Sequence, residues 1–145
     1  MGVHLEPPKG HLPKDVARSP GELPSPVRGQ ARRAADQLLA YLEGNLTRFS
    51  IRWTLPGDCT PFRKGVLETL SRIPFGEVLG YGELASRAGW AGAARAVGQV
   101  MATNPLPLVI PCHRVVAAGG GLGGFTGGIA IKRALLAHEG ISLGE

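Results

Sequence analysis

Proline and glycine constrain the fold of this chain more than any other residues, because they interrupt its sequence at short intervals. The 145 residues include 22 glycines and 12 prolines, which implies many turns and well-defined loops. Half of the prolines lie in residues 1–28, a stretch without apolar periodicity. We expect this stretch to be an extended, poorly ordered leader. For the rest of the chain we expect short elements, mostly α-helices, in an α/β fold.

The composition favours some classes of partner and argues against others. Sixteen Lys and Arg against eleven Asp and Glu give a net charge of +5, which suits a polyanion such as nucleic acid, although the same excess can simply keep a protein soluble. Two cysteines are too few for a disulfide framework, and no spacing typical of zinc ligands occurs. No apolar run approaches the ~20 residues that cross a membrane, and no signal pattern begins the chain. We therefore expect a cytoplasmic protein with no bound metal and no membrane contact.

Two further regions follow the leader. Residues 29–59 contain a helical apolar pattern over 30–42 and an alternating, strand-like pattern over 49–53. Residues 60–145 begin with a helix N-cap, Thr60, followed by proline at the first helical position. We interpret the first region as a reduced N-terminal unit with a helix and a short strand, and the second as the main domain.

Two short helices separated by a glycine-containing turn form a helix–turn–helix pattern in the main domain. The first follows Tyr81, and the second spans about 93–102. One side of the second helix should pack inward, and the other carries small residues and a single long cation. Such a flat face suits close approach to a nucleic-acid backbone or groove, although it could instead pack against another helix. The residues expected to face inward are Ala93, Ala96, Val97 and Val100, and those expected to face outward are Arg95, Gly98, Gln99 and Ala102.

Cys112 is the strongest candidate for chemistry. It lies between Pro111 and His113, directly after an apolar run over 108–110, so we expect a buried strand that ends at the proline and presents the cysteine at a turn. The thiolate is the nucleophilic form of cysteine, and a neighbouring imidazole can accept the thiol proton. Taken alone, the pair favours an inert buried cysteine over a reactive one, because cysteine is among the most buried residue types.

A glycine-rich loop over 119–128 and a last helix over about 129–139 complete the chain. The loop lacks the pattern of a nucleotide-phosphate loop, so its glycines are either flexible filler or positions where the backbone approaches a planar ligand closely. Glu139, at the end of the helix, places a carboxylate where it could reach back to a buried histidine.

Together these motifs resemble the O6-alkylguanine-DNA alkyltransferases, also called methylated-DNA–protein-cysteine methyltransferases. The resemblance covers residues from about 60 to 144, and several motifs keep the family's order and spacing. It implies a C-terminal alkyltransferase domain that is helix–turn–helix and winged-helix-like. The matching motifs are residues 75–78 followed by Tyr81, residues 94–98, 104–105, 111–116 and 135–140.

The resemblance implies a DNA repair protein that reacts once. Such a protein binds duplex DNA containing O6-alkylguanine from the minor groove, rotates the damaged base out of the stack, and transfers the alkyl group to Cys112. O4-alkylthymine would be a second substrate. Water does not readily cleave the thioether product, so the protein is consumed. No cofactor and no obligate protein partner are implied, and we expect a monomer that is associated with the nucleoid when bound to DNA.

The family's catalytic residues have counterparts at matching positions. Cys112 would be the alkyl acceptor, His113 the general base acting through a water, and Glu139 the carboxylate that orients the imidazole. Asn104 would brace the turn that precedes the active-site segment. Tyr81 would crowd the 3′ phosphate of the target nucleotide, assist flipping, and hydrogen-bond the base as charge builds on leaving.

The resemblance also assigns DNA contacts and a base pocket. Arg95 would enter the base stack in place of the flipped nucleotide, where a planar cation can stack. The other DNA contacts would be Tyr81, Ala94, Ala96 and Gln99, and the pocket walls would be Met101, Pro107, Val115, Phe125, Thr126 and Gly127, with Lys132 as a partner of the pocket loop.

The sequence also departs from the family pattern. The family usually carries an N-terminal domain with a small β-sheet, whereas here only a helix and a short strand are expected before Thr60. Phe125 replaces a tyrosine common in relatives, which removes one hydroxyl near the pocket. Alternative functions are a non-repairing relative that flags O6-alkylguanine for other machinery, a regulatory module that senses alkylation of Cys112, and a thiol hydrolase. The first usually lacks the cysteine, and no oxyanion hole can be argued for the last.

Overall fold

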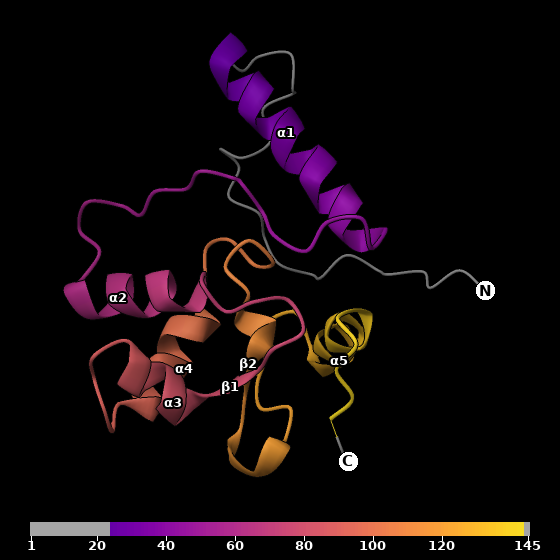
Figure 1. Ribbon diagram of the computed structural model, residues 1–145. Coiled ribbons are helices and arrows are strands. Elements are labelled where there is room, and N and C mark those ends of the chain that lie inside the picture. The colour runs from indigo at the N-terminus through magenta and orange to yellow at the C-terminus, as the bar shows by residue number, and fades with distance from the viewer. Residues whose placement is uncertain (1–23, 144–145) are drawn as a thin grey trace.

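The structure is a computed structural model that describes residues 24–143 (Figure 1). Its helices and short strands bear out the expected α/β, mostly α-helical fold. In chain order the elements are α1 (Ser25–Leu42), α2 (Pro61–Leu70), β1 (Leu79–Gly80), α3 (Tyr81–Arg87), α4 (Ala94–Ala102), the 3-10 helix η3 (Cys112–Arg114), β2 (Val115–Val116), the 3-10 helix η4 (Ala118–Gly120) and α5 (Ile129–His138).

Helix α1 begins earlier than the proline pattern suggested. It starts at Ser25, with Pro24 as its N-cap residue and Pro26 in the first turn. A proline there removes no helical hydrogen bond, because the first N–H groups of a helix have no partner within it. The prediction of a poorly ordered leader was therefore wrong for residues 25–28, and the part of it that falls on residues 1–23 lies outside the described residues.

Residues 49–53 do not form the expected strand. Within residues 24–143 the sheet consists of β1 and β2 alone. Gln37 of α1 holds the start of this segment instead, because its side-chain oxygen accepts from the Ser50 N–H over 2.7 Å. An alternating pattern forms a strand only where a neighbouring backbone is free to pair, and the segment borders a cavity beside the 71–75 turn rather than a sheet edge.

Helix α2 has the N-terminus that its sequence predicts. The Thr60 hydroxyl accepts a hydrogen bond from the Arg63 N–H over 3.3 Å, and proline follows the cap. The helix buries Val66, Leu67 and Leu70 against α3 and α4. This contact forms the main hydrophobic core, which continues to β1 and β2.

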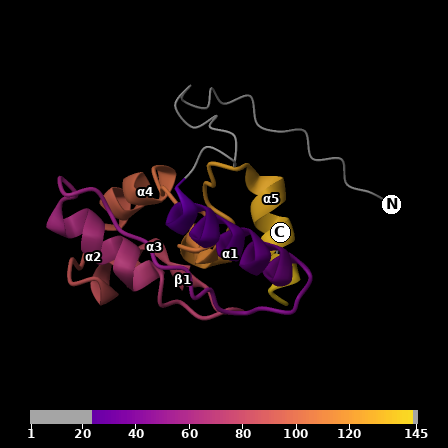
Figure 2. The same cartoon turned by 90° about the horizontal axis from the view of Figure 1, so that it is seen from above.

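Helices α3 and α4 form the expected helix–turn–helix pair. Val97, Val100 and Met101 of α4 are buried, while Gln99 and Arg95 are exposed. Ala96 is also exposed, so its predicted inward orientation was wrong. In the view from above, α3 and α4 lie on the side of α1 opposite to α5 (Figure 2).

The sheet is a parallel pair in which Leu79 faces Val115 and Gly80 faces Val116. The strand follows Cys112 rather than preceding it, which corrects the expected strand over 108–110. Those residues form a tight turn in which the Ile110 N–H donates to Leu106 O over 2.9 Å, and Leu108 has a φ of 74°. Prolines at both ends of the run remove the N–H groups that an extended ladder would need.

Candidate active site

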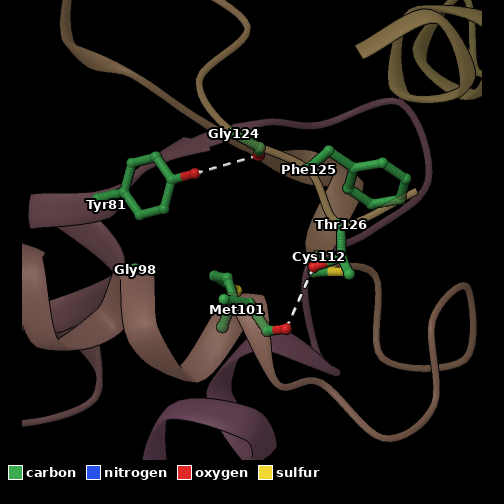
Figure 3. Close-up of a pocket in the computed structure, with 8 residues that line it drawn as sticks. Tyr81, Gly98, Met101, Cys112, Gly124, Phe125 and Thr126 are labelled. Atoms are coloured by element: carbon green, nitrogen blue, oxygen red, sulfur yellow. Dashed lines mark hydrogen bonds between the residues drawn. The ribbon is translucent and has the colours of Figure 1, made fainter. Parts of the chain in front are cut away.

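Cys112 lies at the wall of a cavity of about 260 Å³. It is the first residue of η3 and is 7% exposed. Its position after the 106–110 turn and before β2 fixes the backbone on both sides. The side chains and backbone that line the cavity come from α3, α4, η3 and the glycine-rich loop (Figure 3), and they belong to Tyr81, Gly98, Met101, Ala102, Cys112, Gly124, Phe125 and Thr126.

The glycine-rich loop is held over the cavity from two sides. The Tyr81 hydroxyl donates to Gly124 O over 3.5 Å, and the Thr126 hydroxyl donates to Ala102 O over 3.1 Å (Figure 3). Gly123 has a φ of 66°, and a Cβ there would meet the Tyr81 ring at 3.2 Å. The loop therefore uses glycine where its backbone approaches an aromatic side chain, rather than as flexible filler.

Lys132 of α5 also binds the glycine-rich loop. It is wholly buried, and its ammonium donates to Val115 O of β2 and, over 3.5 Å, to Gly124 O. Burial lowers the pKa of Lys132 to about 8, although the charge of a Cys112 thiolate would raise it. Lys132 thus connects β2 to the glycine-rich loop, and its charge favours the thiolate form of Cys112.

His113 and Glu139 form the pair expected from the sequence. Nε2 of His113 lies 2.8 Å from Oε1 of Glu139, and both side chains are fully buried. Because a carboxylate only accepts hydrogen bonds, Nε2 carries the proton and Nδ1 carries a lone pair. Nδ1 is buried and has no hydrogen-bond partner in the described structure. The imidazole therefore presents one unused acceptor, which is what a general base requires.

The Glu139 carboxylate accepts hydrogen bonds from three further residues. Arg114 binds it through Nε (2.9 Å to Oε2) and Nη2 (2.8 Å to Oε1), while its Nη1 donates to Ile73 O over 2.6 Å. The Tyr41 hydroxyl donates to Oε1 over 2.7 Å, and the Gly76 N–H donates to Oε2 over 3.2 Å. Burial alone would raise the pKa of Glu139, but these bonds and the one from His113 hold it far below its usual value.

Cys112 and His113 are both neutral at rest. Burial raises the pKa of the Cys112 thiol, and the Asn104 side chain offsets only part of that effect. Burial likewise lowers the pKa of His113, and the attraction of Glu139 offsets only part of it. Proton transfer from sulfur to imidazole therefore requires a further favourable interaction, such as one supplied by a bound substrate.

Asn104 braces the turn that leads to Cys112. Its side-chain nitrogen donates to Ile110 O over 2.7 Å, and its side-chain oxygen accepts from the Leu106 N–H over 3.1 Å. One amide thus fixes both ends of the turn, in the place expected from the sequence.

The remaining sequence-derived residues are divided between the cavity and the surface of α4. Met101, Phe125 and Thr126 line the cavity, whereas Val115 is buried beside it and Pro107 and Gly127 are exposed outside its lining. Of the residues assigned to DNA contact, Arg95, Ala96 and Gln99 of α4 are exposed and Ala94 is half-buried, whereas Tyr81 is half-buried and lines the cavity.

Two side chains of the site, Arg114 and Tyr41, were not predicted from the sequence. Arg114 lies in the matching motif over 111–116, and its position directly after His113 could have indicated a contact with the same carboxylate. Tyr41 had no signal in the sequence, because its partner is 98 residues away. Neither a group of three or more metal-ligating side chains nor a helix able to cross a membrane occurs among residues 24–143.

Comparison with known proteins gives a consistent result. Residues 61–141 match the family model for the DNA-binding domain of 6-O-methylguanine DNA methyltransferase. The methylated-DNA–protein-cysteine methyltransferase of Mycobacterium bovis is 47% identical over 79% of this chain and 68% of the relative, and that of Shigella flexneri is 45% identical over 75% and 63%.

A solved structure gives the same result for the fold. The crystal structure of Mycobacterium tuberculosis OGT in complex with DNA superposes with a TM-score of 0.71 and 48% identity, over 74% of this chain and 66% of that chain. The chain thus spans about two thirds of the length of these relatives.

Proposed function

Because the chain belongs to the 6-O-methylguanine DNA methyltransferase family, we propose that it repairs DNA by direct alkyl transfer to itself. Its substrate is O6-alkylguanine in duplex DNA, with O4-alkylthymine as a second substrate, and its acceptor is Cys112. The observation that carries this proposal is the Cys112 thiol at the cavity wall. It is followed by His113, whose Nδ1 has no hydrogen-bond partner in the described structure and whose Nε2 binds the Glu139 carboxylate.

The reaction is a displacement at the alkyl carbon. Nδ1 of His113 takes the thiol proton through a water, which leaves a thiolate and an imidazolium that Glu139 stabilises. The sulfur then forms a bond to the alkyl carbon while the bond from that carbon to O6 breaks. The electron pair of the broken bond stays with guanine, which takes up a proton from water, and the imidazolium of His113 returns its proton to water. The Tyr81 hydroxyl lines the cavity and can donate to the base as this charge develops.

The product explains why the protein reacts once. A thioether has no good leaving group for water to displace, so Cys112 is not regenerated. The protein is a suicide methyltransferase and needs no cofactor, because substrate and acceptor supply all atoms of the transfer.

The outer side of α4 supports the proposed approach to DNA. Its exposed residues are small apart from Arg95 and Gln99, so the helix can come close to a narrow groove. Gly98, on the same helix, lines the cavity, so a base rotated out of the groove would have a short path to Cys112. Arg95 would fill the space that this base leaves in the stack.

Intact-protein mass is the direct test. The protein is incubated with duplex DNA that contains one O6-methylguanine, and with the same duplex containing guanine as the control. We expect the mass of one methyl group to be added only with the damaged duplex, and peptide mapping to place it on Cys112. Tight binding of the damaged duplex without any mass gain would support a lesion-flagging protein instead.

A further inference from the structure

Tyr41 connects the N-terminal helix to the buried carboxylate, although it lies outside the region that matches the family model, residues 61–141. The residue is in the last turn of α1 and is wholly buried. Its hydroxyl donates to Glu139 Oε1 over 2.7 Å, between residues 98 positions apart in the sequence. A hydroxyl buried against the carboxylate that supports His113 can influence the chemistry as well as the packing.

Aromatic side chains fix the orientation of the Tyr41 ring. Phe49 packs on it at a centroid distance of 5.3 Å, and Phe75 meets it edge-on at 6.1 Å. His138 also meets the ring edge-on, at 5.1 Å, and its Nε2 donates to the Tyr41 carbonyl over 2.7 Å. The hydroxyl is therefore held at Glu139 by contacts that do not depend on its own hydrogen bond.

Tyr41 shares one oxygen of Glu139 with His113. Oε1 accepts from His113 Nε2, from the Tyr41 hydroxyl and from Arg114 Nη2, all at 2.7–2.8 Å. Each donor withdraws charge from this oxygen, so each one weakens the attraction that a protonated His113 feels. Burial, reinforced by Glu139, raises the pKa of Tyr41 far above its usual value, so the phenol remains a donor at neutral pH.

We propose that Tyr41 is a positioning residue that holds Glu139 Oε1 and takes up part of its hydrogen-bonding capacity, and thereby restrains thiolate formation at Cys112 until substrate is bound. This inference rests on the proposed role of His113 as the base for Cys112. The other charged or titratable groups around the pair are Arg114 and Lys132, which disfavour the imidazolium, and His138, whose proton is committed to the Tyr41 carbonyl.

The expected benefit is selectivity for the substrate. A thiol that remains protonated reacts slowly with small electrophiles in solution, whereas a thiolate paired with an imidazolium reacts quickly. Loss of the phenol would leave Glu139 more attractive to the imidazolium. The proton would then leave Cys112 more readily, and the single reaction of the protein would be spent on molecules other than damaged DNA.

The test uses Tyr41→Phe, which keeps the ring and removes the hydroxyl. It is made in a Cys59→Ser background, because Cys59 is the other thiol of the chain. Two quantities are measured without DNA: the pKa of His113 by NMR titration of its imidazole, and the rate at which iodoacetamide alkylates Cys112 at pH 7. We expect the pKa of His113 to rise by about half a unit to one unit and the alkylation rate to rise about threefold to tenfold.

Phe49→Leu is the matched control, because it loosens the packing around Tyr41 but leaves every hydrogen bond of Glu139 in place. It should change both quantities much less than Tyr41→Phe does, because Phe75 and His138 still hold the ring and the hydroxyl remains. Equal shifts in the two variants would reduce Tyr41 to a packing role and overturn the proposal, as would a folded Tyr41→Phe protein with the wild-type pKa of His113.

A second substitution tests the proposal even if Tyr41→Phe does not fold. Site-specific 3-fluorotyrosine at position 41 is a stronger hydrogen-bond donor of almost the same shape, so it should lower the pKa of His113 and slow alkylation. No change, or a change in the other direction, would overturn the proposal. Both measurements are independent of repair: a wild-type protein that fails to take up a methyl group from O6-methylguanine would refute the proposed function and leave the outcome for Tyr41 unaffected.

Discussion

The two sides of the active site are built in opposite ways. On the side of Cys112 the cavity is lined mainly by apolar groups and glycine, and three side-chain hydrogen bonds of 3.1–3.5 Å hold its loop. On the side of Glu139 the carboxylate is buried among donors from α1, the turn after α2, and η3, with bonds as short as 2.7 Å. The Cys112 sulfur thus borders a cavity, whereas the Glu139 carboxylate that supports His113 is enclosed by hydrogen-bond donors.

This difference separates reactivity from stability. A cavity that must admit a damaged base cannot fill itself with side chains, so it contributes little to folding. The Glu139 cluster never meets the substrate, so it can be fully bonded and can keep His113 in one orientation and one tautomer. Substitutions on the two sides should therefore affect different measurements.

Cys112→Ser should have the largest effect on alkyl transfer and little effect on stability. We expect alkyl transfer from O6-methylguanine DNA to fall below detection, because a serine hydroxyl is a far weaker nucleophile than a thiolate at neutral pH. The free energy of unfolding should change by about 1 kcal/mol or less, because the sulfur lies at the cavity wall. Intact mass and urea unfolding measure the two effects, and methyl transfer to the variant would refute the role of Cys112.

Glu139→Gln should have the largest effect on stability. The amide cannot balance the buried Arg114 guanidinium, so we expect a loss of about 3–5 kcal/mol in the free energy of unfolding at pH 7. The apparent pKa of the Cys112 thiol should also rise, because the imidazolium loses its supporting charge. Urea unfolding and the pH dependence of iodoacetamide alkylation test these effects. A variant as stable as the wild type would show that the hydrogen bonds around Glu139 do not stabilise the fold.

The contribution of Glu139 should depend on pH in a defined direction. The pKa of its carboxyl is depressed in the folded protein relative to the ordinary value of 4.5, so the stabilisation is complete above that value and is lost as the pH falls below it. The difference in unfolding free energy between wild type and Glu139→Gln should therefore be smaller at pH 3 than at pH 6. Urea unfolding at both pH values measures it, and a difference that stays constant would contradict the ionised state of Glu139.

Arg95→Ala tests the exposed approach to the cavity, where we expect the smallest effect. The side chain lies on the outer side of α4 and belongs to neither side of the site. Repair of duplex DNA should slow by about tenfold to a hundredfold, which corresponds to about 1–3 kcal/mol, while reaction with free O6-benzylguanine should hardly change. Rates are followed by intact mass for both substrates, and equal losses would argue against the stack-filling role.

The sequence predicted the fold well where the signals were local. Thr60 and Pro61 marked the start of α2, because an N-cap and a proline act within one turn. It failed where the outcome depended on a partner. Residues 49–53 alternate but have no free strand to pair with, and the apolar run over 108–110 closes a turn because prolines flank it.

The site shows the same division. The pairing of His113 with Glu139 followed from the resemblance of the two motifs that contain them. The contact of Tyr41 with Glu139 did not follow from any pattern, because an isolated tyrosine at the end of an amphipathic helix is read as part of the apolar face. Long-range hydrogen bonds between buried groups are visible only once the chain is folded.

The position of Glu139 after all four of its partners in the sequence sets the order in which the site can form. During synthesis Tyr41, Gly76, His113 and Arg114 all leave the ribosome before the carboxylate that binds them. Until α5 is complete, the guanidinium of Arg114 has no counter-ion and must stay hydrated, which keeps η3 from settling into its buried position. The nascent chain therefore carries its nucleophile, Cys112, before it carries the carboxylate that supports His113, and the synthesis of α5 and Glu139 completes the site.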